Sequence, residues 1–183
     1  MRKSLYLGIL RLFGWKIHYT IPKEIKKAVV IVAPHTSNWD FVIGKLAFIK
    51  ISKHAKFLIK QEWFKFPMGG FLKWVGALPV DRSSKSMTTK QIANYFKDKD
   101  ELFIIITPEG TRKRTNHWKK GFYQIAMHTE LPICFAYVDY KKKEGGLGGY
   151  FYPTGDYDKD FEIIEAFYKD KTARFPENFN LTK

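Results

Sequence analysis

Cysteine is nearly absent from this chain of 183 residues, which contains only Cys134. A single cysteine excludes an internal disulfide and a metal site built from cysteines alone. Because Cys134 lies in the apolar stretch "LPICFAYV", we expect a buried and unreactive thiol. Long hydrophobic runs are also lacking, since no apolar stretch approaches the roughly 20 residues that a membrane-spanning helix needs.

Acidic residues are scarce relative to basic ones, with 18 Asp and Glu against 32 Lys and Arg. The resulting net charge of +14 favours an anionic partner, which can be a nucleic acid, a membrane surface, or acidic substrates and carriers. Apolar residues make up 45% of the chain, so it is not a disordered protein. Its length fits one domain over residues 1–183.

The segment 4–15, "SLYLGILRLFGW", is too short to cross a bilayer and is interrupted by Arg11. Basic residues flank its apolar face, which is typical of a short amphipathic helix in a membrane interface. A helix that covers the protein core would carry the same pattern. Both alternatives stay open for this segment.

Strand and helix patterns alternate along the rest of the chain. The predicted strands are 28–33, 56–60, 77–81, 101–107 and 132–140. The predicted helices are 38–51, 66–76, 86–97, 122–129 and 158–172, and the glycine-rich stretch 141–149 is predicted to be a turn. This order indicates a single α/β domain with a mostly parallel or mixed central sheet flanked by helices. In such a sheet, ligands bind at the loops beyond the carboxyl ends of the strands.

The loop after the first of these strands holds two ionisable residues, in "APHTSNWDF" (33–41). If both were helical, a spacing of five residues at about 100° each would leave them roughly 140° apart. The spacing therefore favours His35 in the loop and Asp40 in the first turn of the next helix. There the carboxylate can fix the tautomer of an imidazole that acts as a general base. Taken alone, the spacing also fits helix capping and surface polarity.

A second polar loop, "PEGTRKRTNHWKKG" (108–121), follows the most apolar predicted strand. Pro108 ends that strand, Gly110 lets the backbone approach a ligand closely, and the guanidinium of Arg112 suits phosphate. Arg82 follows another strand end, in "GALPVDRS". Three such loops bring one base and several cations together, which favours attack of a phosphate-bearing hydroxyl compound on an acyl carbon. A solvated basic loop is the alternative interpretation.

Together these stretches resemble the glycerophospholipid acyltransferase family, of the lysophosphatidic acid acyltransferase type. That family carries four ordered blocks, which correspond here to "HTSNWD" (35–40), "GALPVDR" (76–82), "PEGTR" (108–112) and "LPI" (131–133). The blocks follow one another in the expected order and spacing. An unbroken "PEGTR" downstream of the histidine block is the most specific of these features. The resemblance also implies a fold similar to that of glycerol-3-phosphate acyltransferase.

The resemblance implies a role for individual residues. His35 is expected to deprotonate the acceptor hydroxyl, and Asp40 to orient and charge-balance the imidazole. The other implied positions bind the acceptor or shape its pocket: Lys60 in "IKQEW", Arg82, Glu109, Gly110, Thr111, Arg112, and Lys119 and Lys120 in "WKKG". The implied reaction is direct attack of the acceptor on a thioester, without a metal, a resident cofactor or a covalent enzyme intermediate.

The resemblance also implies the partners of the protein. They are an acyl thioester of coenzyme A or of acyl carrier protein, a phosphorylated lysolipid such as 1-acylglycerol-3-phosphate, and an anionic membrane surface. A strongly basic surface suits all of them. The expected location is peripheral, at the cytoplasmic face of the membrane. Trp15 and Trp63 fit either a membrane interface or the core, whereas we expect Trp74 in the core.

Two alternatives stay open at the level of the sequence. The first is acylation of a different lysolipid or of an amino-acid-derived lipid. The second, from another class, is a basic nucleic-acid- or membrane-binding protein without catalysis. No recognisable nucleic-acid-binding motif occurs, and the basic residues are spread along the chain, so we do not expect a nucleic-acid partner.

Overall fold

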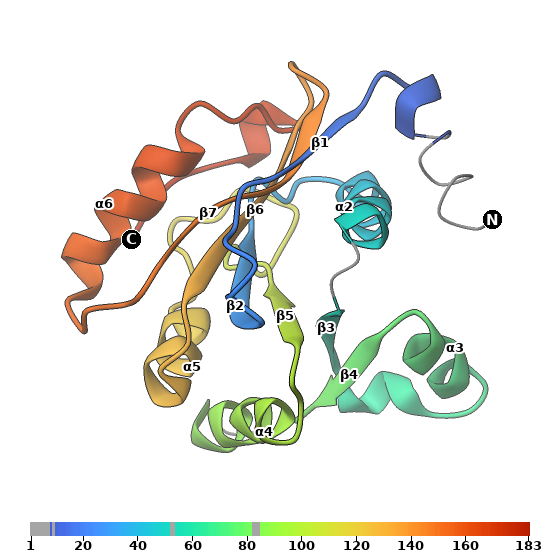
Figure 1. The fold of residues 1–183 in the computed structure, drawn as a ribbon, viewed down its shortest axis with the longest axis vertical. Coiled ribbons are helices and arrows are strands. Elements are labelled where there is room, and N and C mark those ends of the chain that lie inside the picture. Colours follow the sequence, from blue (N-terminus) through green and yellow to red (C-terminus); the bar gives the residue numbers. More distant parts are fainter. Residues whose placement is uncertain (1–7, 9, 52–53, 82–84) are drawn as a thin grey trace.

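The computed structural model describes residues 8, 10–51, 54–81 and 85–183. One seven-stranded sheet runs through it in the order β1-β7-β6-β2-β5-β3-β4 (Figure 1). The strands are β1 (Lys16–Tyr19), β2 (Lys27–Val32), β3 (Ala55–Lys60), β4 (Ala77–Val80), β5 (Leu102–Ile106), β6 (Ile133–Asp139) and β7 (Glu144–Phe151). All neighbouring strands are parallel except β6 and β7, which are antiparallel. The predicted α/β fold with a mostly parallel sheet is confirmed.

Helices cover both faces of this sheet. They are α2 (Asn38–Ile51), α3 (Met68–Trp74), α4 (Lys85–Lys97), α5 (Gly121–Thr129) and α6 (Tyr157–Tyr168), with short 3-10 helices η1 (Gln61–Phe64) and η2 (Pro176–Asn178). One buried cluster joins residues of α4, α5 and α6 to the sheet, and a second joins α2 to the opposite face. The sheet is therefore the middle of three layers.

Strand β2 lies at the centre of the sheet, between β5 and β6. Its residues Ala28–Ile31 are fully buried, as expected for a strand covered on both faces. The β-branched sequence "AVVIV" supplies side chains that fill both layers. The loop that follows β2 thus starts from a fully buried central strand, which fixes the position of the residues it carries. Cys134 of the neighbouring β6 is also buried, as predicted.

Strands β1 and β7 differ from the sequence prediction. The predicted turn 141–149 is largely strand β7, and β1 was not predicted at all. Glycines in β7 allow close approach of neighbouring chain segments, since a Cβ at Gly146 would overlap the carbonyl oxygen of His18 in β1. A short, half-exposed edge strand such as β1 has too weak a pattern to be found in the sequence.

The structure also bears on the predictions for the tryptophans and for segment 4–15. Trp74 is 80% exposed, so the expectation that it packs in the core was wrong. Trp63 is also exposed, at 62%, whereas Trp15 is half-buried. Residues 4–7 and 9 of segment 4–15 lie outside the described residues, whereas Leu10–Leu12 are helical. Within the part of the chain that is described, no helix has the length and apolar character needed to cross a membrane.

Candidate active site

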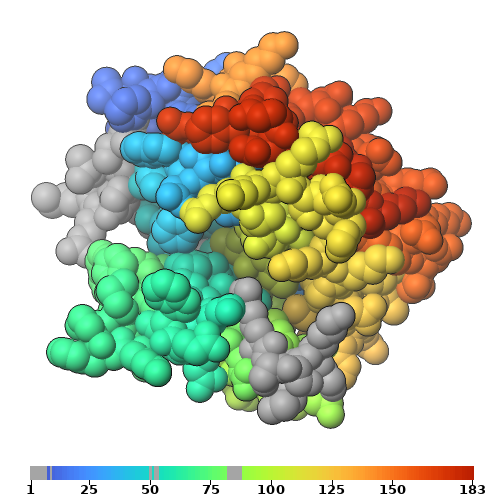
Figure 2. Space-filling view, turned by 180° about the vertical axis from the view of Figure 1, so that it is seen from behind, coloured from blue at the N-terminus to red at the C-terminus, as the bar shows by residue number. Residues whose placement is uncertain are grey.

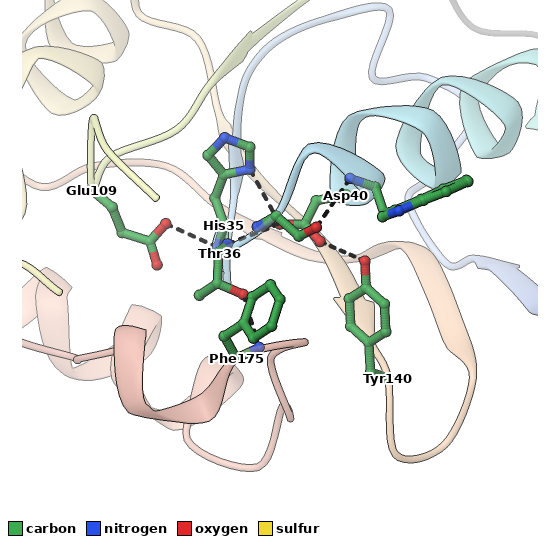
Figure 3. Close-up of polar contacts among 8 residues, drawn as sticks. His35, Thr36, Asp40, Glu109, Tyr140 and Phe175 are labelled. Atoms are coloured by element: carbon green, nitrogen blue, oxygen red, sulfur yellow. Dashed lines mark hydrogen bonds and ion pairs between the residues drawn. The ribbon is translucent and has the colours of Figure 1, made fainter. Parts of the chain in front are cut away.

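The loop between β2 and α2 brings His35 and Asp40 together, as the spacing predicted (Figure 3). Nδ1 of His35 lies 3.4 Å from Oδ2 of Asp40. The imidazole is 20% exposed, whereas the Asp40 side chain is 1% exposed. The histidine can therefore reach a ligand while the carboxylate behind it is shielded from water.

The turn that enters α2 holds the Asp40 carboxylate in place. The backbone N–H groups of Thr36 and Ser37 each donate to Oδ2 of Asp40 at 2.8 Å. Ser37 occupies the cap position of α2, since its hydroxyl accepts from the N–H of Trp39 at 3.2 Å. Burial alone would raise the pKa of Asp40, but hydrogen bonds from His35, Tyr140 and Ser37 outweigh it and lower the pKa. Asp40 is accordingly ionised at neutral pH.

Tyr140, which follows β6, is a member of this site that the sequence did not predict. Its hydroxyl donates to Oδ1 of Asp40 at 2.6 Å, across a separation of 100 residues (Figure 3). Burial, together with the hydrogen bond to Asp40 and the charge of that residue, raises the pKa of Tyr140. The tyrosine therefore stays protonated and acts as a permanent donor to the carboxylate. Nothing in the local sequence around Tyr140 indicates this contact.

Glu109 supports the His35 loop from the opposite side. Its Oε2 accepts from the backbone N–H of His35 at 2.9 Å, and the side chain is buried (Figure 3). Its Oε1 is buried and has no hydrogen-bond partner among the described residues. Burial and the nearby charge of Asp40 raise the pKa of Glu109 to about 8, although the hydrogen bond from His35 opposes the shift. A protonated Glu109 thus fixes the backbone that carries the histidine.

The carboxyl-terminal segment also packs onto both site loops. The backbone N–H of Phe175 donates to Oγ1 of Thr36 at 3.2 Å. Trp118, at the end of the 108–121 loop, is 1% exposed, and its indole donates to the carbonyl of Asn180 at 2.9 Å. These contacts hold the two loops against the same segment, which keeps their relative position fixed.

A pocket of about 1260 Å³ lies against His35 and Asp40. Figure 2 shows this face of the molecule hollowed between α2, the segment after β3 and the 108–121 loop. Part of its lining is cationic and polar: Arg112, His117, Lys119, Lys120 and Lys183. The rest is largely apolar and includes Phe41, Phe48, Phe57, Ile92, Ile106 and Phe122. The pocket therefore suits a molecule with an anionic group and a long hydrocarbon chain.

Some of the predicted binding residues line this pocket, and others do not. Gly110, Arg112, Lys119 and Lys120 line it. Gly110 has a φ of 67°, and the Lys119 side chain packs so close to it that a Cβ would meet the lysine at 2.7 Å. Glu109 supports the His35 loop, as described above.

Two other predicted positions, Thr111 and Lys60, are not in the pocket lining. Thr111 is exposed, and its hydroxyl accepts from the N–H of Lys113 at 3.2 Å. Lys60 is exposed at the carboxyl end of β3. Arg82 lies outside the described residues. Lys183 and His117 were missed, because isolated basic residues in a chain with so many of them carry no specific signal.

The chain matches the acyltransferase family over residues 16–138. It is 30% identical to 1-acyl-sn-glycerol-3-phosphate acyltransferase of Streptococcus pneumoniae over 69% of its own length and 50% of that protein. It is 36% identical to the enzyme of the same name from Cocos nucifera over 45% of its own length and 29% of that protein. The chain thus spans half or less of the length of these relatives.

The fold is similar to the crystal structure of the 1-acyl-sn-glycerophosphate acyltransferase PlsC from Thermotoga maritima. The TM-score is 0.57 at 14% sequence identity, with 94% of this chain and 80% of the other covered. Similarity at this level of identity concerns the arrangement of strands and helices. The matched family region contains the His35, Asp40 and Glu109 positions described above.

Proposed function

Because the chain belongs to the acyltransferase family, we propose that it transfers a fatty acyl group from a thioester to the free hydroxyl of a lysophospholipid. The acceptor that fits best is a 1-acylglycerol-3-phosphate, the substrate class in the names of its relatives. The observation that carries the proposal is the His35–Asp40 pair beside a pocket with both cationic and apolar lining.

In the proposed reaction, His35 acts as the general base. With Nδ1–H directed at Asp40, Nε2 is free to take the proton of the acceptor hydroxyl. The acceptor oxygen then attacks the thioester carbon, the new C–O bond forms, and the C–S bond breaks. The proton held by the imidazolium returns to the leaving thiolate. Asp40 stabilises the imidazolium while it exists, because the carboxylate stays ionised in the site.

The cations of the pocket are proposed to bind the acceptor phosphate. Arg112 offers a planar pair of donors, and Lys119 and Lys120 add point charges. Gly110 contributes by leaving space for the Lys119 side chain. Lys60, Thr111 and Arg82 remain proposed contacts of the acceptor. The apolar walls are proposed to receive a hydrocarbon chain of either substrate, since burial of each methylene contributes about 0.8 kcal/mol.

The charge of the protein supports the proposed donor and the proposed location. Coenzyme A and acyl carrier protein are both anionic, as are membranes rich in acidic lipids, and the net charge of +14 attracts all three. We propose that the protein works peripherally at the cytoplasmic face of a membrane, where the acceptor lipid resides.

Acyl transfer with purified protein tests this proposal. The assay combines a radiolabelled acyl thioester with 1-acylglycerol-3-phosphate, with phosphate-free monoacylglycerol as a second acceptor. We expect His35→Ala to lower kcat by at least about 1000-fold, since both general-base catalysis and its electrostatic support are lost. We expect Tyr140→Phe to lower kcat about tenfold with little change in KM, because one charge-assisted hydrogen bond to Asp40 disappears.

Matched controls separate catalysis from folding. His117→Ala removes another imidazole of the pocket lining and should retain most of kcat. Tyr152→Phe removes a hydroxyl from an exposed tyrosine and should behave as wild type. Undiminished transfer by folded His35→Ala protein, or equal use of the two acceptors, would contradict the proposed chemistry or the proposed phosphate site respectively.

A further inference from the structure

The segment that joins β3 to β4 is rich in exposed large apolar side chains. We call this segment, residues 61–76, the aromatic arm; it contains η1 and α3 and projects from the β3–β4 edge of the sheet (Figure 1). Five large apolar side chains of the arm are exposed: Trp63 by 62%, Phe66 by 98%, Met68 by 46%, Phe71 by 55% and Trp74 by 80%. Contiguous exposed apolar surface of this kind marks an interaction site.

The arm has a defined inner side, so these side chains are not simply unpacked. Gly69 and Leu72 are its buried residues in α3. Gly69 packs so closely on the carbonyl of Phe64 that a Cβ there would overlap it, and its N–H donates to the carbonyl of Lys65 at 3.0 Å. The rings of Phe71 and Trp74 lie side by side on the outside, with centroids 6.0 Å apart. The fold therefore presents at least these two rings outward as a pair.

Basic residues lie close to these aromatic residues in the sequence. Lys65 and Lys73 lie in the arm, Lys60 directly precedes it, and all three are exposed. Glu62 is the acidic residue among them, so this stretch carries three positive charges against one negative. Tryptophan and phenylalanine next to lysines are typical of surfaces that bind the interface of an anionic bilayer.

Contacts connect the arm to the wall of the pocket. Nζ of Lys45 in α2 donates to the carbonyl of Val75 in the arm at 2.7 Å. Phe41 of α2, which lines the pocket, is 44% exposed and contacts Phe57 edge-to-face, with ring centroids 4.9 Å apart. Trp39 is also exposed, by 54%, so α2 contributes exposed apolar surface of its own. Figure 2 shows the hollow of the pocket between these two elements.

We propose that the aromatic arm docks the protein on a bilayer rich in anionic lipid, with the pocket beside the membrane surface. This deepens the proposed function, because an acceptor that carries a hydrocarbon chain could then enter the pocket from the bilayer. A second copy of this chain is a poorer occupant, since two molecules with a net charge of +14 would meet through lysine-bearing surfaces. An acidic protein would pair with the lysines, but it would not account for so many exposed aromatic rings.

Flotation with lipid vesicles tests the arm directly. The full chain is mixed with vesicles of phosphatidylcholine and phosphatidylglycerol in equal parts, and the floating fraction gives a partition coefficient. We expect Phe66→Ser with Trp74→Ser to lower that coefficient roughly tenfold or more, since two large side chains no longer leave water. Phe66→Leu with Trp74→Phe should keep most of the binding. Binding by wild type should also weaken in high salt or with phosphatidylcholine alone.

The matched control is Tyr152→Ser with Ile163→Ser, two exposed apolar residues outside the arm (58% and 45%). This control should float as wild type does, and near-ultraviolet circular dichroism should show that both serine variants are folded. Equal flotation of wild type and the arm variant would overturn the proposal, and so would equal losses in the arm variant and the control. A lipid-independent dimer in sedimentation velocity that only the arm variant loses would identify a second copy as the occupant.

An activity measurement keeps this proposal separate from the proposed function. With acceptor dispersed in detergent micelles, the arm variant should transfer acyl groups at the wild-type rate while failing to bind vesicles. Wild-type protein that floats through the arm but transfers nothing in micelles would refute the acyltransferase and leave the docking surface standing. Full activity in micelles with no flotation of wild type would refute the docking surface alone.

Discussion

Asp40 is the most heavily bonded side chain of the site. Its two oxygens face four partners: the N–H groups of Thr36 and Ser37, the hydroxyl of Tyr140 and the imidazole of His35. A carboxylate held by so many donors keeps one orientation and stays charged when the histidine beside it changes protonation. The residue therefore combines the roles of anchor for the loop and counter-charge for the imidazole.

Glu109 makes a prediction about stability and pH. Its pKa is raised from 4.5 to about 8 in the folded protein, so it binds its proton more tightly than it would in the unfolded chain. The unfolded state then loses this proton first as pH rises, and wild-type stability falls between about pH 4.5 and about pH 8. Glu109→Gln keeps an acceptor for the N–H of His35 and cannot ionise, so this contribution to the pH dependence should vanish.

Urea unfolding of both proteins at several pH values measures the effect. Between pH 5 and pH 7.5, the free energy of unfolding of Glu109→Gln should rise relative to wild type by roughly 3 kcal/mol. Glu162→Gln, at an exposed position of α6, is the control and should follow wild type. Parallel curves for Glu109→Gln and wild type would mean that Glu109 is ionised in the folded protein across this range.

The site was only partly predictable from the sequence, for reasons that differ from residue to residue. His35, Asp40 and the "PEGTR" loop were predictable, because their functions depend on local spacing after a buried strand. Tyr140 was not, because its contact with Asp40 exists only once β2 and β6 are neighbours in the sheet. The buried role of Glu109 also depends on the meeting of two loops, which the sequence placed at one sheet edge without specifying their contacts.

At the scale of elements, buried strands and amphipathic helices followed the sequence pattern closely. The predicted helix 38–51 coincides with α2, and the five predicted strands, which correspond to β2 through β6, differ from the observed ones by at most one residue at each end. The edge formed by β1 and β7 did not follow it, because glycines are depleted in strands on average. Here their lack of side chains is what lets β7 lie close to β1 and to the ring of Phe167. Tertiary packing thus overrides local preference at this edge.

Gly146 in β7 allows this interpretation to be tested. It has a φ of 134°, which side-chain-bearing residues rarely adopt, and a Cβ would overlap the carbonyl oxygen of His18 in β1. Gly146→Ala should therefore destabilise the protein by at least about 2 kcal/mol, through backbone strain and separation of β1 from β7. For a chain of this size, that corresponds to a fall in Tm of about 4–8 °C.

Gly70→Ala is the matched control for Gly146→Ala. A Cβ at Gly70, which lies in α3, would meet nothing within 4 Å, and alanine favours helix by up to about 1 kcal/mol relative to glycine. Its Tm should stay unchanged or rise slightly. If Gly146→Ala had the same Tm as Gly70→Ala, the close approach of β7 to β1 would contribute nothing to stability.

At the scale of the whole molecule, charge acts together with shape. The excess of positive charge was evident from the sequence, but its function depends on which surfaces of the folded protein carry it. The structure collects Arg112, Lys119, Lys120 and Lys183 in the lining of one pocket, and exposes further lysines on the aromatic arm. An anionic substrate approaching this face meets a positive field before it makes any contact.

This field should be visible as a salt dependence of acyl transfer. Raising the ionic strength from about 10 mM to about 1 M shortens the Debye length from about 30 Å to about 3 Å, so long-range attraction is lost. With acceptor in neutral detergent micelles, kcat/KM for an acyl-coenzyme A donor should fall by roughly tenfold or more over this range. An acyl thioester of N-acetylcysteamine, which carries no phosphate, should show a much smaller fall when the same acceptor is saturating. Equal salt sensitivity of the two donors would mean that the donor phosphates do not experience the field, and that the basic pocket acts on the acceptor alone.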